Sequence, residues 1–177
     1  MKKRLISCHQ IIKLILLITI LLPFDHFAKT TETDLTTIIL VRHAEKVDNS
    51  TDPDLSEVGY ERVERFTSMF QNVPIDAIFS TDFKRTLETA TPLAEMNNLE
   101  IQYCEYQNAS LEVEKWIQEH NGDTILISGH STTTPSVANA ILGEEHFENN
   151  FEESDYGNIL IITISSDGDE KLLHLRY

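Results

Sequence analysis

The chain has 177 residues and an apolar fraction of 41%, which suffices for the core of one domain of the usual size, about 100–200 residues. Its net charge of −15 argues against nucleic acid or an anionic membrane surface as a partner, because both are bound through basic faces. We expect residues 29–177 to form this domain, which keeps 28 of the 29 acidic residues but only 10 of the 14 basic ones.

The N-terminal segment, residues 1–28, has the pattern of a secretory signal. A basic start, Met1–Arg4, precedes an apolar run at 11–22 that is shorter than a transmembrane helix. His26 and Ala28 do not form a small-x-small cleavage pair, so an uncleaved N-terminal membrane anchor is the alternative. In both cases we expect the domain to be exported, to a periplasm or to the outside of the cell.

The first predicted strand, residues 37–41, is apolar on both faces and is expected to be buried in a parallel sheet. It ends at Arg42 and His43. These polar residues are costly at the end of a buried strand unless they reach the crevice at the strands' carboxyl ends, where α/β sheets bind ligands. A loop rich in Asp, Asn and Ser follows at 45–54, and a helix capped by its first residue is predicted over 56–71.

A second strand is predicted at 75–80. Its last residue, together with Thr81 and Asp82, offers three possible caps for the next helix. Arg85 lies in the first turn of that helix, and Pro92 is expected to end or kink it.

The remaining predicted elements alternate between strand and helix and then close with a hairpin. In order they are a short strand at 99–103, a helix at 111–120 packed through Leu111 and Trp116, a strand at 124–128 followed by His130, a helix ending at Gly143, an acidic loop at 144–155, and paired strands at 158–164 and 172–175. This order predicts an α/β fold, a three-layer α/β/α sandwich whose mostly parallel sheet carries a C-terminal antiparallel hairpin.

Four side chains are expected to converge at the strand ends: Arg42, His43, Arg85 and His130. A guanidinium binds phosphate bidentately and keeps its charge at physiological pH, and the start of the helix after residue 80 would add backbone N–H donors. A neutral histidine can attack phosphorus, and a second histidine can stabilise charge on the transferred oxygens. The residues therefore favour a pocket for a phosphoryl group.

Four short blocks carry a resemblance to a known family. They are Arg42-His43-Ala44-Glu45, Leu55-Ser56-x-x-Gly59, Ser80-Thr81 with Arg85, Thr89 and Ala90, and Gly129-His130-Ser131. Together, and in this order, they resemble the histidine phosphatase superfamily (branch 1), which includes the phosphoglycerate mutases. The chain has no room for the long insertions of the mutases, so it is more similar to the small phosphohistidine-phosphatase-like members.

The resemblance implies roles for the residues that match. His43 would be the phosphorylated nucleophile, with Arg42, Arg85 and His130 as the other catalytic residues. The substrate phosphate would be bound by Arg42, Arg85, Asn49 and Ser131. No cofactor and no metal are expected.

The resemblance also implies a proton donor for the leaving group, because many members carry an acidic residue after the arginine block. Glu105 is the nearest match, and Glu45, Asp54 and Asp155 are lesser candidates. Small members that act on phosphohistidine can lack this acid, since a phosphoramidate leaving group is protonated more readily.

The predicted function is therefore that of an exported, metal-independent phosphatase acting on phosphomonoesters or phosphoramidates through a phosphohistidine at His43. Its partner would be a phosphorylated small molecule or a phosphoprotein. The alternative is a phosphate-binding module of the same fold that has lost turnover.

Two other classes of enzyme fit the sequence less well. Ser131 lies in a Gly-x-Ser context, and Asp155 and His174 follow it in the order of a serine hydrolase triad, but Thr133 replaces the second glycine. The hydrolase interpretation also leaves the arginines without a role. A metal enzyme is disfavoured because the seven histidines include no pair at ligand spacing.

Overall fold

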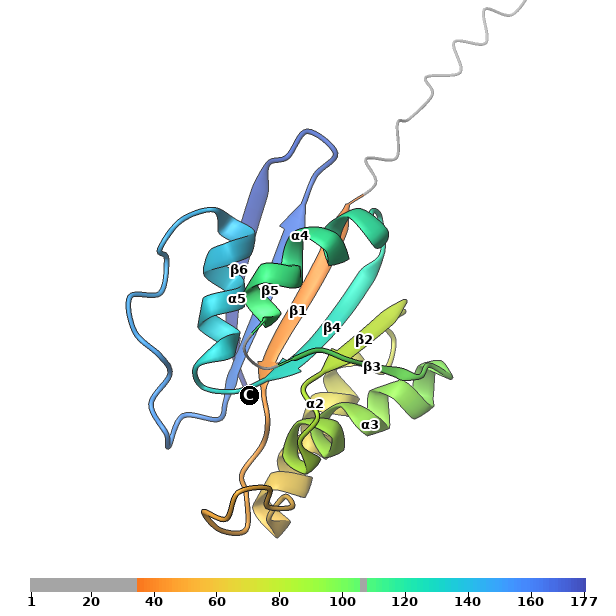
Figure 1. The fold of residues 1–177 in the computed structure, drawn as a ribbon. Coiled ribbons are helices and arrows are strands. Elements are labelled where there is room, and N and C mark those ends of the chain that lie inside the picture. The colour runs from red at the N-terminus through yellow and green to blue at the C-terminus, as the bar shows by residue number, and fades with distance from the viewer. Residues whose placement is uncertain (1–34, 106–107) are drawn as a thin grey trace, which may run out of the picture. The chain divides into compact units, whose positions relative to one another are not determined.

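The alternation of apolar side chains along the central strands determines how this chain folds, because successive residues of a strand face opposite sides of the sheet. The computed structural model describes residues 35–105 and 108–177 (Figure 1). The strands are β1 (Thr36–Arg42), β2 (Ala77–Ser80), β3 (Ile101–Tyr103), β4 (Thr124–Gly129), β5 (Asn158–Ile164) and β6 (Glu170–Arg176). The helices of this part are α2 (Glu57–Phe70), α3 (Lys84–Asn97), α4 (Ala109–Glu119) and α5 (Thr133–Leu142).

The strands form one six-stranded sheet in the order β3-β2-β4-β1-β5-β6. The pairs β2–β3, β2–β4 and β1–β4 are parallel, whereas β1–β5 and β5–β6 are antiparallel. The predicted mostly parallel sheet with a C-terminal antiparallel hairpin is therefore confirmed.

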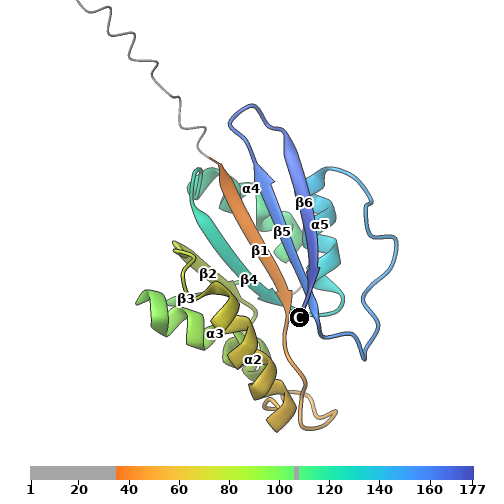
Figure 2. The same cartoon turned by 180° about the vertical axis from the view of Figure 1, so that it is seen from behind.

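Each face of the sheet is covered by two helices. On one face, alternate strand residues such as Ile38 and Leu40 pack against α4 and α5 (Figure 1). On the other face, the intervening residues Ile39 and Val41 pack against α2 and α3 (Figure 2). The three-layer sandwich follows from this period of two, and it buries β1 on both sides.

The carboxyl ends of β1, β2 and β4 meet at one edge of the sheet. In the β1–β4 ladder Arg42 pairs with Gly129, and in the β2–β4 ladder Ser80 pairs with Ser128. The residues that follow the three strands, which start with His43, Thr81 and His130, are thereby brought to one place. Parallel pairing of buried strands is thus what positions the site.

Three local predictions about helices are wrong. Residues 80–82 do not cap α3, because its N-cap residue is Phe83, whose side chain makes no capping hydrogen bond. Pro92 neither ends nor splits this helix, which continues to Asn97 and stops at Asn98 in the left-handed conformation, with φ of 55°. Burial of Leu93 and other residues beyond the proline offsets the one backbone hydrogen bond that Pro92 lacks.

The third wrong prediction concerns the helix after β3. Leu111 is 78% exposed, whereas Trp116 is buried as predicted, and α4 packs through it together with Ala109 and Val113. These three residues are spaced four and three apart and so share one helix face, whereas Leu111 lies on another.

Residues 1–28, interpreted from the sequence as a signal or an anchor, lie outside the described residues. Within 35–105 and 108–177, no helix is both long and apolar enough to span a bilayer.

Gly59 explains one of the four sequence blocks, because a side chain at this position would overlap the carbonyl oxygen of Glu45. That oxygen also accepts a hydrogen bond from the backbone N–H of Ser56, at 2.8 Å, so helix α2 starts directly against the segment that follows β1. Glycine in this block therefore permits close backbone contact next to the strand end.

Gly59→Ala is expected to lower the free energy of unfolding by about 2 kcal/mol or more, as overpacking does. The sign is diagnostic, since the same change at an open helix position stabilises by about 0.5–1 kcal/mol. Urea denaturation of Gly59→Ala and of the exposed control Glu61→Ala measures the effect. A stabilised Gly59→Ala variant contradicts the close contact.

Candidate functional site

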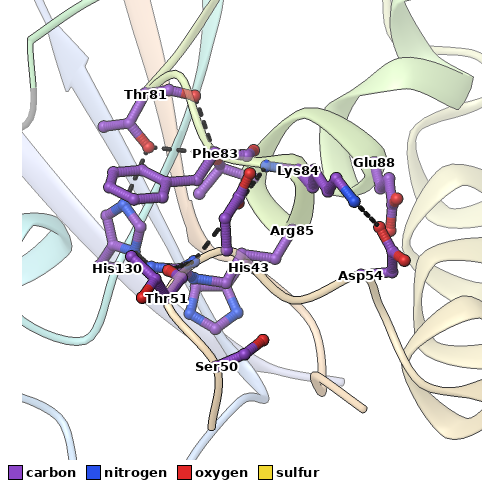
Figure 3. Close-up of polar contacts among 12 residues, drawn as sticks. His43, Ser50, Thr51, Asp54, Thr81, Phe83, Lys84, Arg85, Glu88 and His130 are labelled. Atoms are coloured by element: carbon purple, nitrogen blue, oxygen red, sulfur yellow. Dashed lines mark hydrogen bonds and ion pairs between the residues drawn. The ribbon is translucent and has the colours of Figure 1, made fainter. Parts of the chain in front are cut away.

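His43 and His130 lie side by side where β1 and β4 end. The backbone N–H of His43 donates to the carbonyl of Gly129 at 2.9 Å, which continues the parallel ladder by one residue beyond the strand. The two rings are edge to face, with centroids 5.4 Å apart and planes at 70° (Figure 3). The expected convergence of the two histidines is therefore found, with both residues buried.

The hydrogen bond of the His43 ring fixes which nitrogen can react. Its Nδ1 lies 2.7 Å from the carbonyl oxygen of Ala44, and a carbonyl only accepts, so Nδ1 carries the proton. In the neutral ring Nε2 then holds the free lone pair. Burial, together with the charges of Arg42 and Arg85, lowers the pKa of His43 to about 4. The ring is therefore neutral, as a nucleophile must be, at physiological pH.

His130 has the opposite tautomer. Its Nδ1 lies 3.4 Å from a guanidinium nitrogen of Arg85, which only donates, so Nε2 carries the proton and donates to Thr81 Oγ1 at 2.8 Å (Figure 3). The chain continues from Thr81 to Thr86, whose hydroxyl donates to the backbone carbonyls of Thr81 and Phe83. Burial and the neighbouring positive charges lower the pKa of His130 to about 3.

Arg85 enters the site from the first turn of α3, as predicted. Its guanidinium lies 3.4 Å from the carbonyl oxygen of Thr51 and 3.8 Å from the carboxylate of Asp52. Asp52 also accepts from the backbone N–H of Lys84, at 2.9 Å. The start of α3, expected to offer N–H donors to an anion, thus already holds the Asp52 carboxylate on one of these donors.

Arg42 is placed differently from the prediction. Its side chain is 1% exposed, and Nη1 donates to the carbonyls of Glu152 and Asp155, at 2.8 and 3.1 Å. Nη2 lies 3.2 Å from the carboxylate of Glu153, and the guanidinium stacks on Tyr156 at 4.0 Å from the ring centre. Its Nε is buried and has no hydrogen-bond partner among the residues that the structure describes.

A cavity of about 240 Å³ opens between the histidines and the acidic loop. Its walls are formed by His43, Lys46, Phe83, Arg85, His130, Ser131, Thr132 and Glu153. Four of the residues predicted for the site are thus brought together: His43, Arg85, His130 and Ser131. Arg42, Asn49 and Glu105 are not in its walls, and Asn49 is exposed in the loop between β1 and α2.

The carboxylates considered as proton donors are engaged elsewhere. Glu105 is exposed beyond β3 and accepts a hydrogen bond from Asn108 at 2.8 Å. Glu45 pairs with Arg62, Asp54 with Lys84, and Asp155 with Arg176. Within the described part of the chain, Glu153 is the carboxylate that lines the cavity.

The structure does not assemble the serine hydrolase triad. The hydroxyl of Ser131 donates a hydrogen bond to the Glu153 carboxylate at 3.2 Å, and the His174 ring is hydrogen-bonded through Nε2 to Asn158 Oδ1 at 2.8 Å. Asp155 is occupied by Arg176. Among residues 35–105 and 108–177, no group of three His, Cys, Asp or Glu side chains is arranged to hold a metal ion.

Sequence reasoning missed Glu153, Thr81 as a partner of His130, and Tyr156 beneath Arg42. The predicted loop at 144–155 is acidic, and its residues Phe147 and Phe151 pack on the core. An acidic loop is usually solvated, however, and the sequence gives no signal that this loop closes over Arg42.

Because both site histidines are buried and neutral, acidification is expected to destabilise the fold already at pH values above those at which carboxylates titrate. Between pH 7 and pH 5 the unfolded chain, with histidine pKa near 6.5, binds protons that the folded chain, with pKa values of about 4 and about 3, does not. Stability therefore falls as the pH falls, by about 1–2 kcal/mol per histidine at pH 5. Urea unfolding at both pH values measures this loss.

His130→Gln is expected to show a smaller loss between pH 7 and pH 5 than the wild type. The matched control is His146→Gln, since His146 is exposed. An unchanged pH dependence in His130→Gln contradicts the assignment of a buried neutral ring.

Comparisons with known proteins agree with this geometry. The model of the histidine phosphatase superfamily (branch 1) matches residues 38–106. Phosphoserine phosphatase 1 of Hydrogenobacter thermophilus is 39% identical over an alignment of 71 residues, and the match covers 36% of this chain and 34% of that protein. The match thus spans about a third of the length of this relative.

Solved structures share the fold. YhfR of Bacillus stearothermophilus superposes with a TM-score of 0.64 and 19% identity, over 77% of this chain and 95% of that one. A phosphoserine phosphatase from Entamoeba histolytica, in complex with 3-phosphoglyceric acid, gives 0.61 and 18%, over 80% and 97%. The predicted α/β fold is therefore confirmed, and the predicted family is the one whose model matches residues 38–106.

Proposed function

We propose that the chain is a member of the histidine phosphatase superfamily (branch 1), whose model matches residues 38–106, and that it hydrolyses phosphomonoesters through a phosphohistidine at Nε2 of His43. The observation that carries the proposal is the tautomer of this ring. Its Nδ1–H is held by the carbonyl of Ala44, so the lone pair of Nε2 is left for attack, beside His130 and Arg85.

The reaction has two steps. In the first, Nε2 attacks phosphorus, the P–N bond forms and the ester P–O bond breaks. In the second, water attacks phosphorus, the P–N bond breaks and phosphate leaves. Positive charge from Arg85 stabilises the equatorial oxygens in both transition states, as cationic clamps do in phosphoryl transfer.

Arg42 would bind the substrate phosphate after exchanging one of its present contacts. An incoming phosphate oxygen would take the place of the Glu153 carboxylate on Nη2, and it could also accept from Nε, which has no partner among the described residues. Charge-assisted bonds of this kind are the strong ones, and the buried guanidinium is held in place by two backbone carbonyls. Ser131, in the cavity wall, supplies a hydroxyl.

Hydrolysis of p-nitrophenyl phosphate by the protein, with a chelator present, tests the proposal. Turnover that is inhibited by vanadate is expected. O-phosphoserine is a natural second substrate to try, because the curated relative is a phosphoserine phosphatase. A serine hydrolase would instead cleave p-nitrophenyl acetate and leave the phosphate ester intact.

A binding module of the same fold is the second candidate, favoured by one observation: Glu105, the predicted proton donor, is not in the cavity wall. Saturable binding of phosphate or vanadate without turnover of any phosphate ester would support it.

We also propose that the protein is exported, on the pattern of residues 1–28. Cell fractionation and N-terminal sequencing of the recovered protein test this proposal. Full-length protein in the cytoplasmic fraction would contradict it.

A further inference from the structure

Glu153 is the acidic residue of the cavity. Its carboxylate contacts two residues that we assign to phosphate binding, with one oxygen 3.2 Å from Nη2 of Arg42 and the other 3.2 Å from the hydroxyl of Ser131. The side chain is otherwise 76% exposed toward the opening, whereas that of Arg42 is 1% exposed. Glu153 therefore stands at the entrance, between the phosphate ligands and solvent.

Binding of a phosphate changes the surroundings of this carboxylate. A dianionic phosphoryl group competes for Arg42 and Ser131, which are the two hydrogen-bonding partners of Glu153. The carboxylate then faces the phosphate as a like charge, and Lys46 in the cavity wall is the cation that remains near both anions. A substrate that carries its own cation close to the phosphate removes this repulsion.

The space beyond the phosphate pocket is also lined by groups that can accept hydrogen bonds from a cation. A second, more open hollow of about 600 Å³ shares Ser131, Thr132 and Glu153 with the first cavity. The rest of its wall is Asn149, Asn150, Phe151 and Glu152, so it offers carboxylates and amides but no cation. Two positive side chains, Lys46 and Arg85, line the phosphate pocket.

The leaving group also needs a proton. Of the carboxylates in the described part of the chain, Glu153 alone lines the cavity, and the pairing with Arg42 holds its pKa below the ordinary value although its partial burial acts the other way. A general acid must be protonated at the working pH, so this group is poorly suited to the task. An ammonium two carbons from the ester oxygen makes that oxygen a less basic leaving group and so lowers the demand for an acid.

We propose that Glu153 is a specificity-determining residue that binds the ammonium group of the substrate, so that the enzyme prefers phosphomonoesters of amino alcohols. The inference rests on the proposed phosphatase function and names its substrate class. The carboxylate moves from Arg42 to the substrate ammonium as the phosphate takes its place on the guanidinium. No covalent step involves Glu153.

The test compares two substrates of nearly equal size, phosphoethanolamine and 2-hydroxyethyl phosphate, which differ in an ammonium against a neutral hydroxyl. In the wild type, kcat/KM is expected to be about 10-fold higher for the ammonium compound, the value of one charge-assisted hydrogen bond. In Glu153→Gln the ratio is expected to fall by about 10-fold, to the value that the two leaving groups set on their own. Glu148→Gln, a charge change in the same loop but outside both hollows, keeps the wild-type ratio.

The ratio of kcat/KM for the two substrates distinguishes ammonium binding by Glu153 from other roles of this residue. If the residue only competes with phosphate for Arg42, Glu153→Gln raises kcat/KM equally for both substrates, and the ratio is the same in the variant and in the wild type. If it donates a proton, Glu153→Gln lowers kcat for both alkyl esters equally and spares p-nitrophenyl phosphate. Either result overturns the inference.

Failure of the phosphatase proposal is visible separately, as no turnover of p-nitrophenyl phosphate. In that case the same ratio is measured as dissociation constants of the two compounds by calorimetry. Equal constants overturn the inference, and tighter binding of phosphoethanolamine that is lost in Glu153→Gln supports it.

Discussion

His43→Ala is expected to lower kcat for p-nitrophenyl phosphate by at least about 10³-fold, because removal of a covalent nucleophile leaves only binding and charge stabilisation to catalyse the reaction. The fold is expected to persist. Among the described residues, the imidazole hydrogen-bonds to the carbonyl of the next residue, and the backbone of residue 43 still pairs with Gly129 in the variant.

His146→Ala is the matched control, since it removes an exposed histidine outside the cavity wall, and less than a twofold change is expected. Vanadate binding by His43→Ala shows whether the pocket survives the substitution. Full activity in His43→Ala, with loss in Ser131→Ala, would make Ser131 the nucleophile and refute the phosphohistidine mechanism.

Arg85→Gln is expected to lower kcat/KM for p-nitrophenyl phosphate by about 10²–10³-fold. Hydrogen bonds to charged groups contribute about 1.5–3 kcal/mol each, and the guanidinium fork can make two of them to phosphate. Glutamine keeps much of the side chain's length and polarity but not the charge. The loss should appear in vanadate affinity as well as in turnover.

The control is the preceding residue. Lys84→Gln removes the same charge from the same helix turn, but the ammonium of Lys84 pairs with Asp54, at 2.9 Å, and is not in the cavity wall (Figure 3). Less than a threefold loss is expected, the value of an exposed ion pair. Equal losses in the two variants would mean that Arg85 acts through the general field of the protein and does not bind phosphate.

The pattern of the central strands made the fold and the two histidines predictable. Residues 37–41 and 124–128 are apolar on both faces, so they had to be buried neighbours in a parallel sheet. The residue after each strand is then fixed in space by the ladder, and this is where His43 and the segment containing His130 were expected and are found. The apolar pattern within each strand and the position of the strand in the sheet therefore lead to the same placement of the histidines.

Where the prediction failed, tertiary contacts outweighed local preference. The continuation of α3 through Pro92 depends on burial of Leu93 against the sheet. Helix propensities describe single residues and do not include such tertiary burial. Leu111 was expected in the core because it is apolar, but Val113 and Trp116 define the buried face of α4.

The position of Arg42 was predictable and its contacts were not. Its place at the end of β1 follows from the strand, but its bonds to Glu152, Glu153 and Asp155 join positions more than 100 residues apart in the chain. No periodicity links a strand end to a distant acidic loop. The entrance residue Glu153 was missed for this reason.

The most direct measurement of the central claim is to trap the phosphorylated protein. The enzyme is mixed with a radiolabelled phosphomonoester, quenched at alkaline pH, where phosphohistidine persists, and digested for mass spectrometry. We predict one phosphate per chain on the peptide that contains His43, lost on treatment with acid and lacking in His43→Ala. Label on Ser131 or on His130, or turnover with no trapped phosphate and undiminished activity in His43→Ala, would contradict the account.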